Sequence, residues 1–207
     1  MPLKLQYLSI RYLAEPARLI LYYANESFED ERLTQETWEP IKASSPYNTV
    51  PILTVDGKHQ IAQSMAIYHY LAQKYGLAGK GEIEVAKVEA VGEYFREMMN
   101  KILPYLLFLI GKNSEGTKES NYAKYFEPTV KQYLPVMIKL LKESKSEFFA
   151  DSGATWVDFL VAEYIDSIHG HAPDVLKNYS ELLEHSKRVH SLPQLQKYLQ
   201  SRPTTPW

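Results

Sequence analysis

The chain of 207 residues contains no cysteine. This absence excludes disulfides, thiolate metal sites and a cysteine nucleophile of the protein's own, so thiol chemistry would need a thiol brought in by a ligand. The sequence also has no apolar run near the roughly 18 residues of a membrane span, and its N-terminus lacks the apolar core of a signal peptide. We therefore expect a soluble protein of the cytoplasm.

The chain has no large excess of positive or negative charge, because its 23 Lys and Arg residues are dispersed among 25 Asp and Glu residues. The sequence therefore predicts neither a nucleic acid nor a membrane surface as a partner. A Gly-rich phosphate loop and the Gly-x-Ser-x-Gly nucleophile motif are absent. His169 and His171 are two residues apart and His185 and His190 are five apart, spacings that do not suit one helical face, so these histidines predict no ligand set for a metal.

Residues 1–76 show alternating strand and helix signals, which predict a compact α/β domain. Asp56-Gly57 is the typical signal of a two-residue hairpin turn, and it separates two short strand patterns. The expected elements, in chain order, are a strand at 3–8, a helix at 14–24, a strand at 27–32, a short helix at 38–44, hairpin strands at 52–55 and 58–61, and a helix at 64–75.

Three glycines within six residues, Gly76, Gly79 and Gly81, then interrupt the pattern, and everything after them has helical periodicity. We place a linker at 77–81 and an all-helical domain at 82–207. Thr155 and Asp158 form the capping-box pattern of a helix start. The expected helices of this domain are an apolar stripe over 88–109 and further helices at 122–141, 155–168, 173–189 and 193–200.

The segment before the hairpin predicts a ligand-binding edge. Val50-Pro51 precedes an apolar run, which favours a cis peptide bond at a strand entrance because the trans preference of X-Pro bonds is small. The main chain of Val50 would then be free to pair with an extended peptide. Ser64 is placed to cap the following helix, whose N-terminus attracts anions. Together these features favour a small anionic peptide as the ligand.

Further motifs follow one another along the whole chain. They are Tyr7 at the end of the first strand, Ala14-Glu15, Trp38 with Lys42, Val50-Pro51, Gln63-Ser64 and Trp156-Val157-Asp158. In order and spacing they resemble the cytosolic glutathione transferases, most closely the sigma-like group that includes invertebrate enzymes and prostaglandin D synthases. The resemblance implies a thioredoxin-like N-terminal domain, an all-α C-terminal domain, a homodimer, a role in detoxification, and reduced glutathione as the co-substrate without a metal.

For Tyr7, the resemblance implies the catalytic role. A phenol that donates a hydrogen bond to the sulfur of glutathione favours the thiolate, which is the nucleophile. Tyr7 would act as a donor and not as a general base, since the ordinary pKa of tyrosine is near 10. Arg11 lies close enough in sequence to add its charge to the thiolate site. Pairing with Glu15, four residues further on, is the alternative for this arginine.

The resemblance also assigns contacts to glutathione. Gln63 and Ser64 would bind the γ-glutamyl carboxylate, and Trp38 and Lys42 the glycine end. A simple helix cap, a core tryptophan and a solvated lysine are the alternatives that the residues leave open. The remaining positions of the expected binding set are Thr49, which stands where many relatives carry a lysine, together with Val50, Pro51 and, from the partner subunit, Glu97.

Glu93 and Glu97 lie one turn apart on the expected long helix. The resemblance directs one of them, most directly Glu97, across a dimer interface to the amino group of glutathione, and a solvated acidic face is the alternative. Arg96 stands where a Mg²⁺ site of some relatives needs a carboxylate, so we expect no metal here. Tyr47 occupies the place of an aromatic residue that many relatives insert into the partner subunit.

The electrophile is expected to bind in an adjacent apolar pocket. Sigma-like relatives carry Gly and Arg where this chain has Tyr12 and Leu13, so we expect a narrower pocket and no second cation. The candidate walls are Leu8, Ile10, Tyr12, Leu13, Met99, Leu103 and the C-terminal Trp207. Isomerisation of prostaglandin H2 is an alternative activity. A non-catalytic ligand carrier or a crystallin-like protein is a further alternative, because a fold does not fix a function.

Overall fold

The computed structural model describes residues 2–205. Its N-terminal part, up to residue 75, is built on a four-stranded mixed sheet with the strand order β2-β1-β3-β4. β1 is parallel to β2 and antiparallel to β3, which pairs antiparallel with β4. The strands are β1 (Leu3–Leu8), β2 (Phe28–Leu33), β3 (Ile52–Val55) and β4 (His59–Ala62), and the helices between and after them are α1 (Glu15–Tyr23), α2 (Gln35–Lys42) and α3 (Ser64–Tyr75).

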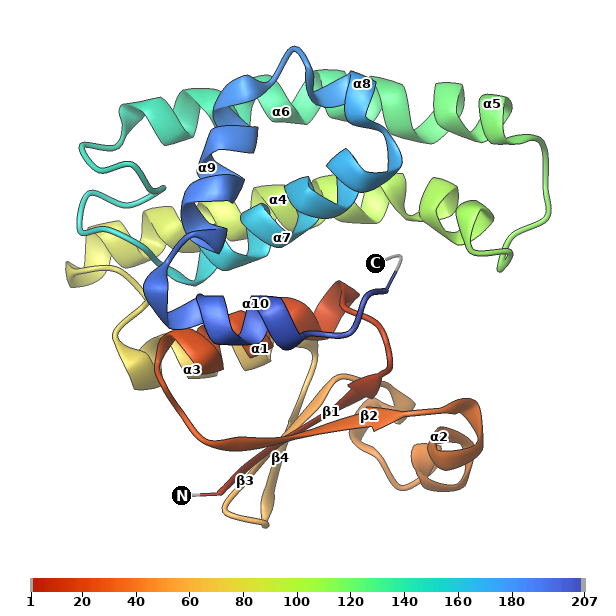
Figure 1. Ribbon diagram of the computed structural model, residues 1–207, viewed down its shortest axis with the longest axis vertical. Helices are drawn as coiled ribbons and strands as arrows, with labels where there is room; N and C mark the ends of the chain where they lie inside the picture. The colour runs from red at the N-terminus through yellow and green to blue at the C-terminus, as the bar shows by residue number, and fades with distance from the viewer. Residues whose placement is uncertain (1, 206–207) are drawn as a thin grey trace.

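Alternation along β1 fixes which face of the sheet is covered. Leu3, Leu5 and Tyr7 are buried, whereas the residues between them are partly exposed. In a strand, residues two apart point to the same face, so this set packs beneath helices. Figure 1 shows α1 and α3 between the sheet and the helices of the C-terminal half, with α2 at one end of the sheet.

The hairpin turn forms at the predicted residues. Asp56 and Gly57 have φ angles of 55° and 65°, and the Lys58 N–H bonds to the Val55 carbonyl at 3.1 Å. This geometry is that of the tight turns that join twisted strands. The second strand begins at His59, one residue later than predicted. The peptide bond between Val50 and Pro51 is cis, as expected.

The second half of the described chain is helical apart from an isolated bridge between Ala150 and Gly153. Within residues 2–205, no helix is long and apolar enough to cross a membrane. The helices are α4 (Gly81–Leu109), α5 (Lys118–Asn121), α6 (Glu127–Glu143), α7 (Trp156–His171), α8 (Pro173–Leu176), α9 (Ser180–His190) and α10 (Gln196–Ser201), with a π-helical turn at Tyr122–Phe126 and short 3₁₀ turns at Tyr12–Ala14, Pro46–Asn48 and Pro193–Leu195.

One predicted helix is divided. The stretch 173–189 forms α8 and α9, because Tyr179 has φ −132° and ψ 44°, outside the helical region. The capping box before α7 is present as predicted, since the Thr155 N–H bonds to the Asp158 carboxylate at 2.7 Å. This cap fixes the start of α7, a largely buried helix that contacts Arg11 and Tyr12 of the loop after β1.

Candidate functional site

Tyr7 lies near the end of β1, and its side chain is almost fully buried at 4% exposure. Burial raises the pKa of its phenol above the ordinary value, and the neighbouring Tyr12 acts in the same direction. The main-chain N–H of Leu13 opposes these effects but does not outweigh them. The phenol therefore keeps its proton at neutral pH and is suited to donate a hydrogen bond.

The start of α3 is open to an anion. Gln63 precedes the helix with φ 73°, a left-handed backbone that is uncommon for residues other than Gly, and within the described chain no side chain caps this end. The first main-chain N–H groups of a helix have no partner inside the helix and attract negative charge. Ser64 was expected to be the cap, but it is the first residue of α3, and Gln63 occupies the capping position.

The main chain of Val50 is also available to a ligand. Val50 lies just outside β3, beyond the residues that pair with β1 and β4, and no hydrogen bond of its main chain is found among the described residues. The preceding Thr49 is exposed and donates a long hydrogen bond of 3.4 Å to the Pro46 carbonyl. An extended peptide could therefore pair with this segment.

Helix α2 carries the two residues expected at the glycine end of glutathione. Thr34 caps its start, because the Thr34 side chain accepts a hydrogen bond from the Thr37 N–H. Trp38 is buried at 8% exposure, whereas Lys42 is exposed at the C-terminal end of the helix and has no ion pair within residues 2–205. Trp38 thus anchors α2, and the charge of Lys42 is free for a ligand.

Arg11 extends away from the sheet toward α7. Its guanidinium bonds to Asp166 at 2.8 Å and lies 3.2 Å from Glu163. The pairing with Glu15 that the sequence left open does not form, since Glu15 bonds to Arg18 at 3.1 Å and to Arg202. Two carboxylates of α7 therefore balance the charge of Arg11, which weakens the field that it could exert on a thiolate.

A narrow apolar pocket of about 50 Å³ lies beside the loop that follows β1. Among the expected wall residues, Ile10, Tyr12 and Leu103 line it. Leu8, Leu13 and Met99 do not line it, and Trp207 lies outside the described residues. Three further residues line the pocket although they were not predicted to do so: Leu106, Leu107 and Ile110.

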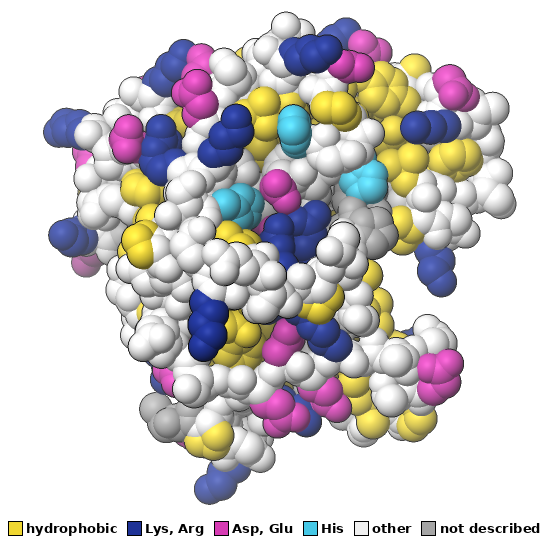
Figure 2. All heavy atoms as spheres, in the orientation of Figure 1, with side chains coloured by type: hydrophobic (Ala, Val, Ile, Leu, Met, Phe, Trp, Pro, Cys, Tyr) yellow, Lys and Arg dark blue, Asp and Glu magenta, His cyan; other side chains and the backbone are white. Residues whose placement is uncertain are grey.

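The three lining residues that were not predicted could have been recognised from their spacing in the sequence. They follow Leu103 by three, four and seven positions, the spacing of one helical face. Figure 2 shows the molecule hollowed on the side between α2 and the helices of the C-terminal half.

On the outer face of α4, Glu97 accepts a hydrogen bond from the Tyr133 hydroxyl and lies 3.3 Å from Lys101. The Tyr133 hydrogen bond is the main cause that lowers the pKa of this carboxyl. Glu93 pairs with Arg96 on the same helix. In the part of the chain that the structure describes, no three His, Cys, Asp or Glu side chains are grouped so as to hold a metal ion.

Comparisons with known proteins agree with this geometry. The sequence profile described as “Glutathione S-transferase, C-terminal domain” matches residues 96–202. Glutathione S-transferase 1 of Ascaris suum is 37% identical over 204 residues, which are 99% of this chain and 98% of that protein. The chain belongs to the glutathione S-transferase family. A probable glutathione S-transferase 6 of Caenorhabditis elegans is 35% identical over the same shares of both chains. A second profile, of an outer mitochondrial membrane transport complex protein, matches residues 19–139.

Solved structures of similar proteins confirm the fold. The glutathione S-transferase of Ascaris lumbricoides matches with a TM-score of 0.95 and 36% identity over 100% of both chains. A structure described as the monomeric transferase Na-GST-3 of Necator americanus gives 0.92 and 32% over 100% of both chains. A prostaglandin synthase D of Nilaparvata lugens gives 0.88 and 29% over 99% of this chain and 100% of that one. The predicted thioredoxin-like and all-helical halves, the transferase activity and glutathione as co-substrate are thereby confirmed.

Proposed function

We propose that this transferase ionises glutathione beside Tyr7 and transfers the sulfur to an electrophile in the pocket next to it. The buried, protonated phenol of Tyr7 at the end of β1 is the observation that carries the proposal. A phenol donor stabilises a thiolate more than a thiol, which lowers the pKa of the bound sulfur. Each tenfold gain in thiolate corresponds to about 1.4 kcal/mol.

In this proposal, residues 1–76 form the glutathione-binding domain, and 82–207, after a linker at 77–81, form the helical domain that supplies much of the pocket. Gln63 and Ser64 at the open start of α3 hold the γ-glutamyl carboxylate, and the Val50 main chain pairs with the cysteinyl unit. The other proposed contacts are Pro51, Thr49, Trp38 and Lys42.

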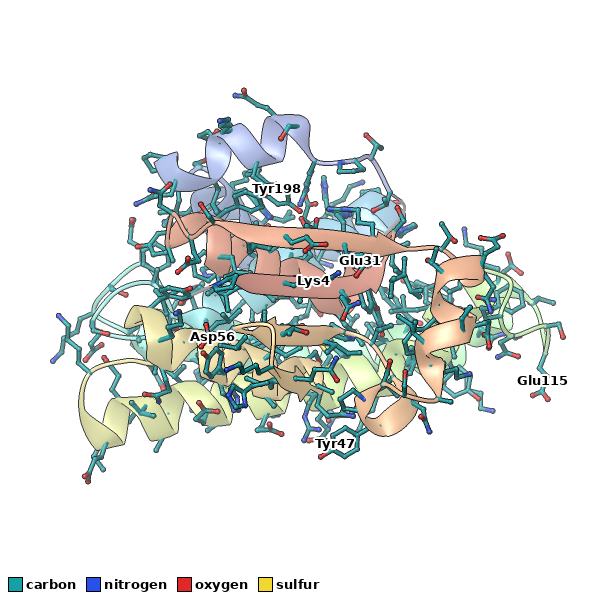
Figure 3. All side chains as sticks on the ribbon, turned by 90° about the horizontal axis from the view of Figure 1, so that it is seen from below. Lys4, Glu31, Tyr47, Asp56, Glu115 and Tyr198 are labelled. Carbon is teal, nitrogen blue, oxygen red and sulfur yellow. The ribbon has the colours of Figure 1, made fainter. Side chains whose placement is uncertain are left out.

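We propose further that the enzyme is a cytoplasmic, sigma-like homodimer that acts in detoxification. Tyr47 supports the dimer, because its ring is 76% exposed and projects from the molecule, as Figure 3 shows. A groove of about 670 Å³ between α4 and α6 would receive this ring, and its walls are largely apolar, with Val91, Val136 and Leu140 among them. In such a dimer, Glu97 binds the amino group of glutathione held by the partner.

Tyr7→Phe tests the proposal. The variant keeps the ring and loses only the donor, so glutathione affinity should change little, while turnover of an aryl halide at neutral pH falls at least ~10-fold. The thiol of bound glutathione should ionise at a pH about one unit higher, measured by thiolate absorbance. Tyr75→Phe is the matched control, because its hydroxyl bonds to Glu26, away from this site. Unchanged turnover in Tyr7→Phe would refute the role of Tyr7.

Isomerisation of prostaglandin H2 is the second candidate function, favoured by the structural match to a prostaglandin synthase. Both reactions need the same thiolate, so Tyr7→Phe does not separate them. Incubating the wild-type enzyme with prostaglandin H2 and glutathione, and analysing the product, decides this point.

A further inference from the structure

Tyr12 stands at the junction of two parts of the site. Its side chain lines the apolar pocket with Leu103 and Ile110. Its phenol is also close enough to Tyr7 to act on the pKa of that residue. Tyr12 therefore lies between the proposed thiolate site and the space for the electrophile.

The backbone at Tyr12 is held in an unfavourable conformation. Its φ angle is 31°, in the region that favours glycine, and such an outlier costs on the order of 1–3 kcal/mol in a bulky residue. Packing holds the ring in place: it lies 5.7 Å from the ring of Tyr164, which in turn meets Phe95 edge-on at 5.9 Å. Outliers that the surroundings maintain in this way are concentrated at functional sites.

The proton of the Tyr12 phenol is free for a substrate. Burial raises the pKa of Tyr12, and the nearby hydroxyl of Tyr164 opposes this only in part. The Tyr164 hydroxyl is fully buried and has no hydrogen bond of good geometry within residues 2–205. The Tyr12 hydroxyl, at the edge of the pocket, likewise has no acceptor within residues 2–205, so its O–H can be donated to a ligand.

The other five residues that line the pocket have no side-chain donor, since they are Ile10, Leu103, Leu106, Leu107 and Ile110. One donor at the edge of an apolar pocket matches a ligand with one polar acceptor and an apolar tail. We propose that Tyr12 determines specificity in the transferase reaction proposed above, by donating a hydrogen bond to the carbonyl oxygen of α,β-unsaturated aldehydes and ketones with apolar chains.

The reaction with such substrates is an addition. The thiolate sulfur forms a bond to the β-carbon, the electron pair of the C=C bond moves toward the carbonyl, and an enolate oxygen carries the charge. Tyr12 donates to that oxygen as its charge develops, while Tyr7 releases the sulfur that it stabilised. The α-carbon then takes one proton from water, so glutathione and the substrate combine without loss of atoms. A donor aimed at a developing oxyanion contributes mainly to the rate of the step.

The test compares two probes. trans-2-Nonenal forms an enolate, whereas benzyl chloride loses chloride and forms no oxyanion. In Tyr12→Phe, the ratio of kcat/KM for nonenal to that for benzyl chloride should fall at least ~10-fold, with the loss in kcat and not in KM. Tyr164→Phe removes a hydroxyl that acts on the phenol of Tyr12 and should lower the same ratio roughly 3-fold. Tyr75→Phe should leave the ratio and both activities unchanged.

An unchanged ratio in Tyr12→Phe, with thermal unfolding like that of the wild type, overturns the role of Tyr12. So does a fall that comes from KM alone, or a wild-type enzyme that converts benzyl chloride but not nonenal. If Tyr12→Phe does not fold, the ratio in Tyr164→Phe decides the question. A wild-type enzyme inert toward both probes overturns the proposed function, and the role of Tyr12 with it.

Discussion

Two arginines far apart in the sequence share the same carboxylates. Arg11 and Arg202 both contact Glu163 and Asp166 of α7, and Arg202 also lies 3.1 Å from the buried Glu15. Figure 2 shows basic and acidic side chains gathered near the centre of the face in view. The loop after β1 is thereby tied to the C-terminal segment, and the position of Tyr12 next to Arg11 depends on this network.

Removing one member of the network should destabilise the fold. In Arg202→Gln, Glu163 and Glu15, at 1% and 0% side-chain exposure, lose one partner each, though Arg11 and Arg18 remain. Breaking a buried pair costs about 3–5 kcal/mol, and we expect the lower end of this range because of the remaining partners. Urea unfolding at neutral pH measures the loss of stability. Lys139→Gln is the control: it breaks an exposed ion pair on α6, so the expected change in the free energy of unfolding is near zero.

The difference should depend on pH. Burial alone would raise the pKa of Asp166, but the hydrogen bond from Arg11 and the charges of His190, Arg11 and Arg202 lower it overall. An acid with a lowered folded-state pKa adds stability above its unfolded pKa of about 4 and loses it as the pH falls through the folded value. The gap between wild type and Arg202→Gln should thus be full at pH 7 and narrow below about pH 4. A constant gap would contradict this assignment.

The contacts of individual residues could be predicted from the sequence where the contact is local or belongs to a known motif. The Thr155–Asp158 capping box needs only three residues of separation, and it is present. The partner of Arg11 could not be predicted in this way, because Asp166 is 155 residues away in the sequence. Local spacing offered only Glu15, and only the packing of α7 against the loop decides the contact.

At the scale of elements, α4 and α7 approach closely at Gly92. A Cβ atom built on Gly92 would lie 2.2 Å from a ring carbon of Trp156, which is fully buried. Gly92→Ala should therefore destabilise the protein by about 1–3 kcal/mol through overpacking, less the gain in helix propensity of up to ~1 kcal/mol. Chemical unfolding measures this change in the free energy of unfolding.

Gly170 is the matched control for that substitution. It also lies in a helix, α7, but a Cβ atom there would meet no atom within 4 Å. Gly170→Ala should leave the stability unchanged or raise it by up to about 1 kcal/mol. Equal effects at both positions would mean that Trp156 does not set the separation of the two helices.

Hydrophobic periodicity predicted whether a segment is a helix or a strand better than it predicted where that helix or strand ends. The helix predicted at 64–75 forms with these bounds, because apolar spacing and Gly76 mark it clearly. Over 173–189 the apolar spacing continues through Tyr179, so the sequence pattern did not show the break that divides α8 from α9. The apolar pocket likewise continues along α4 beyond Leu103, to Ile110 just after the helix ends.

At the scale of the whole molecule, the open question is assembly, since a structural match is described as monomeric. The exposed Tyr47 and the groove between α4 and α6 favour a dimer, and Glu97 on the outer face of α4 favours a site completed by the partner. Association and glutathione binding should then be coupled, and two substitutions separate them.

Tyr47→Ala removes the exposed ring and should convert the dimer to a monomer in sedimentation at assay concentration, with weaker glutathione binding because the partner's carboxylate is lost. Glu97→Gln should stay dimeric, fold normally and bind glutathione roughly 10-fold more weakly, since a charged hydrogen bond to an ammonium group is removed. Glu93→Gln is its control, because it removes the same charge one turn earlier on α4. A wild-type monomer with full activity would exclude the shared site. Loss of binding in Glu93→Gln but not in Glu97→Gln would keep the dimer and move the role to Glu93.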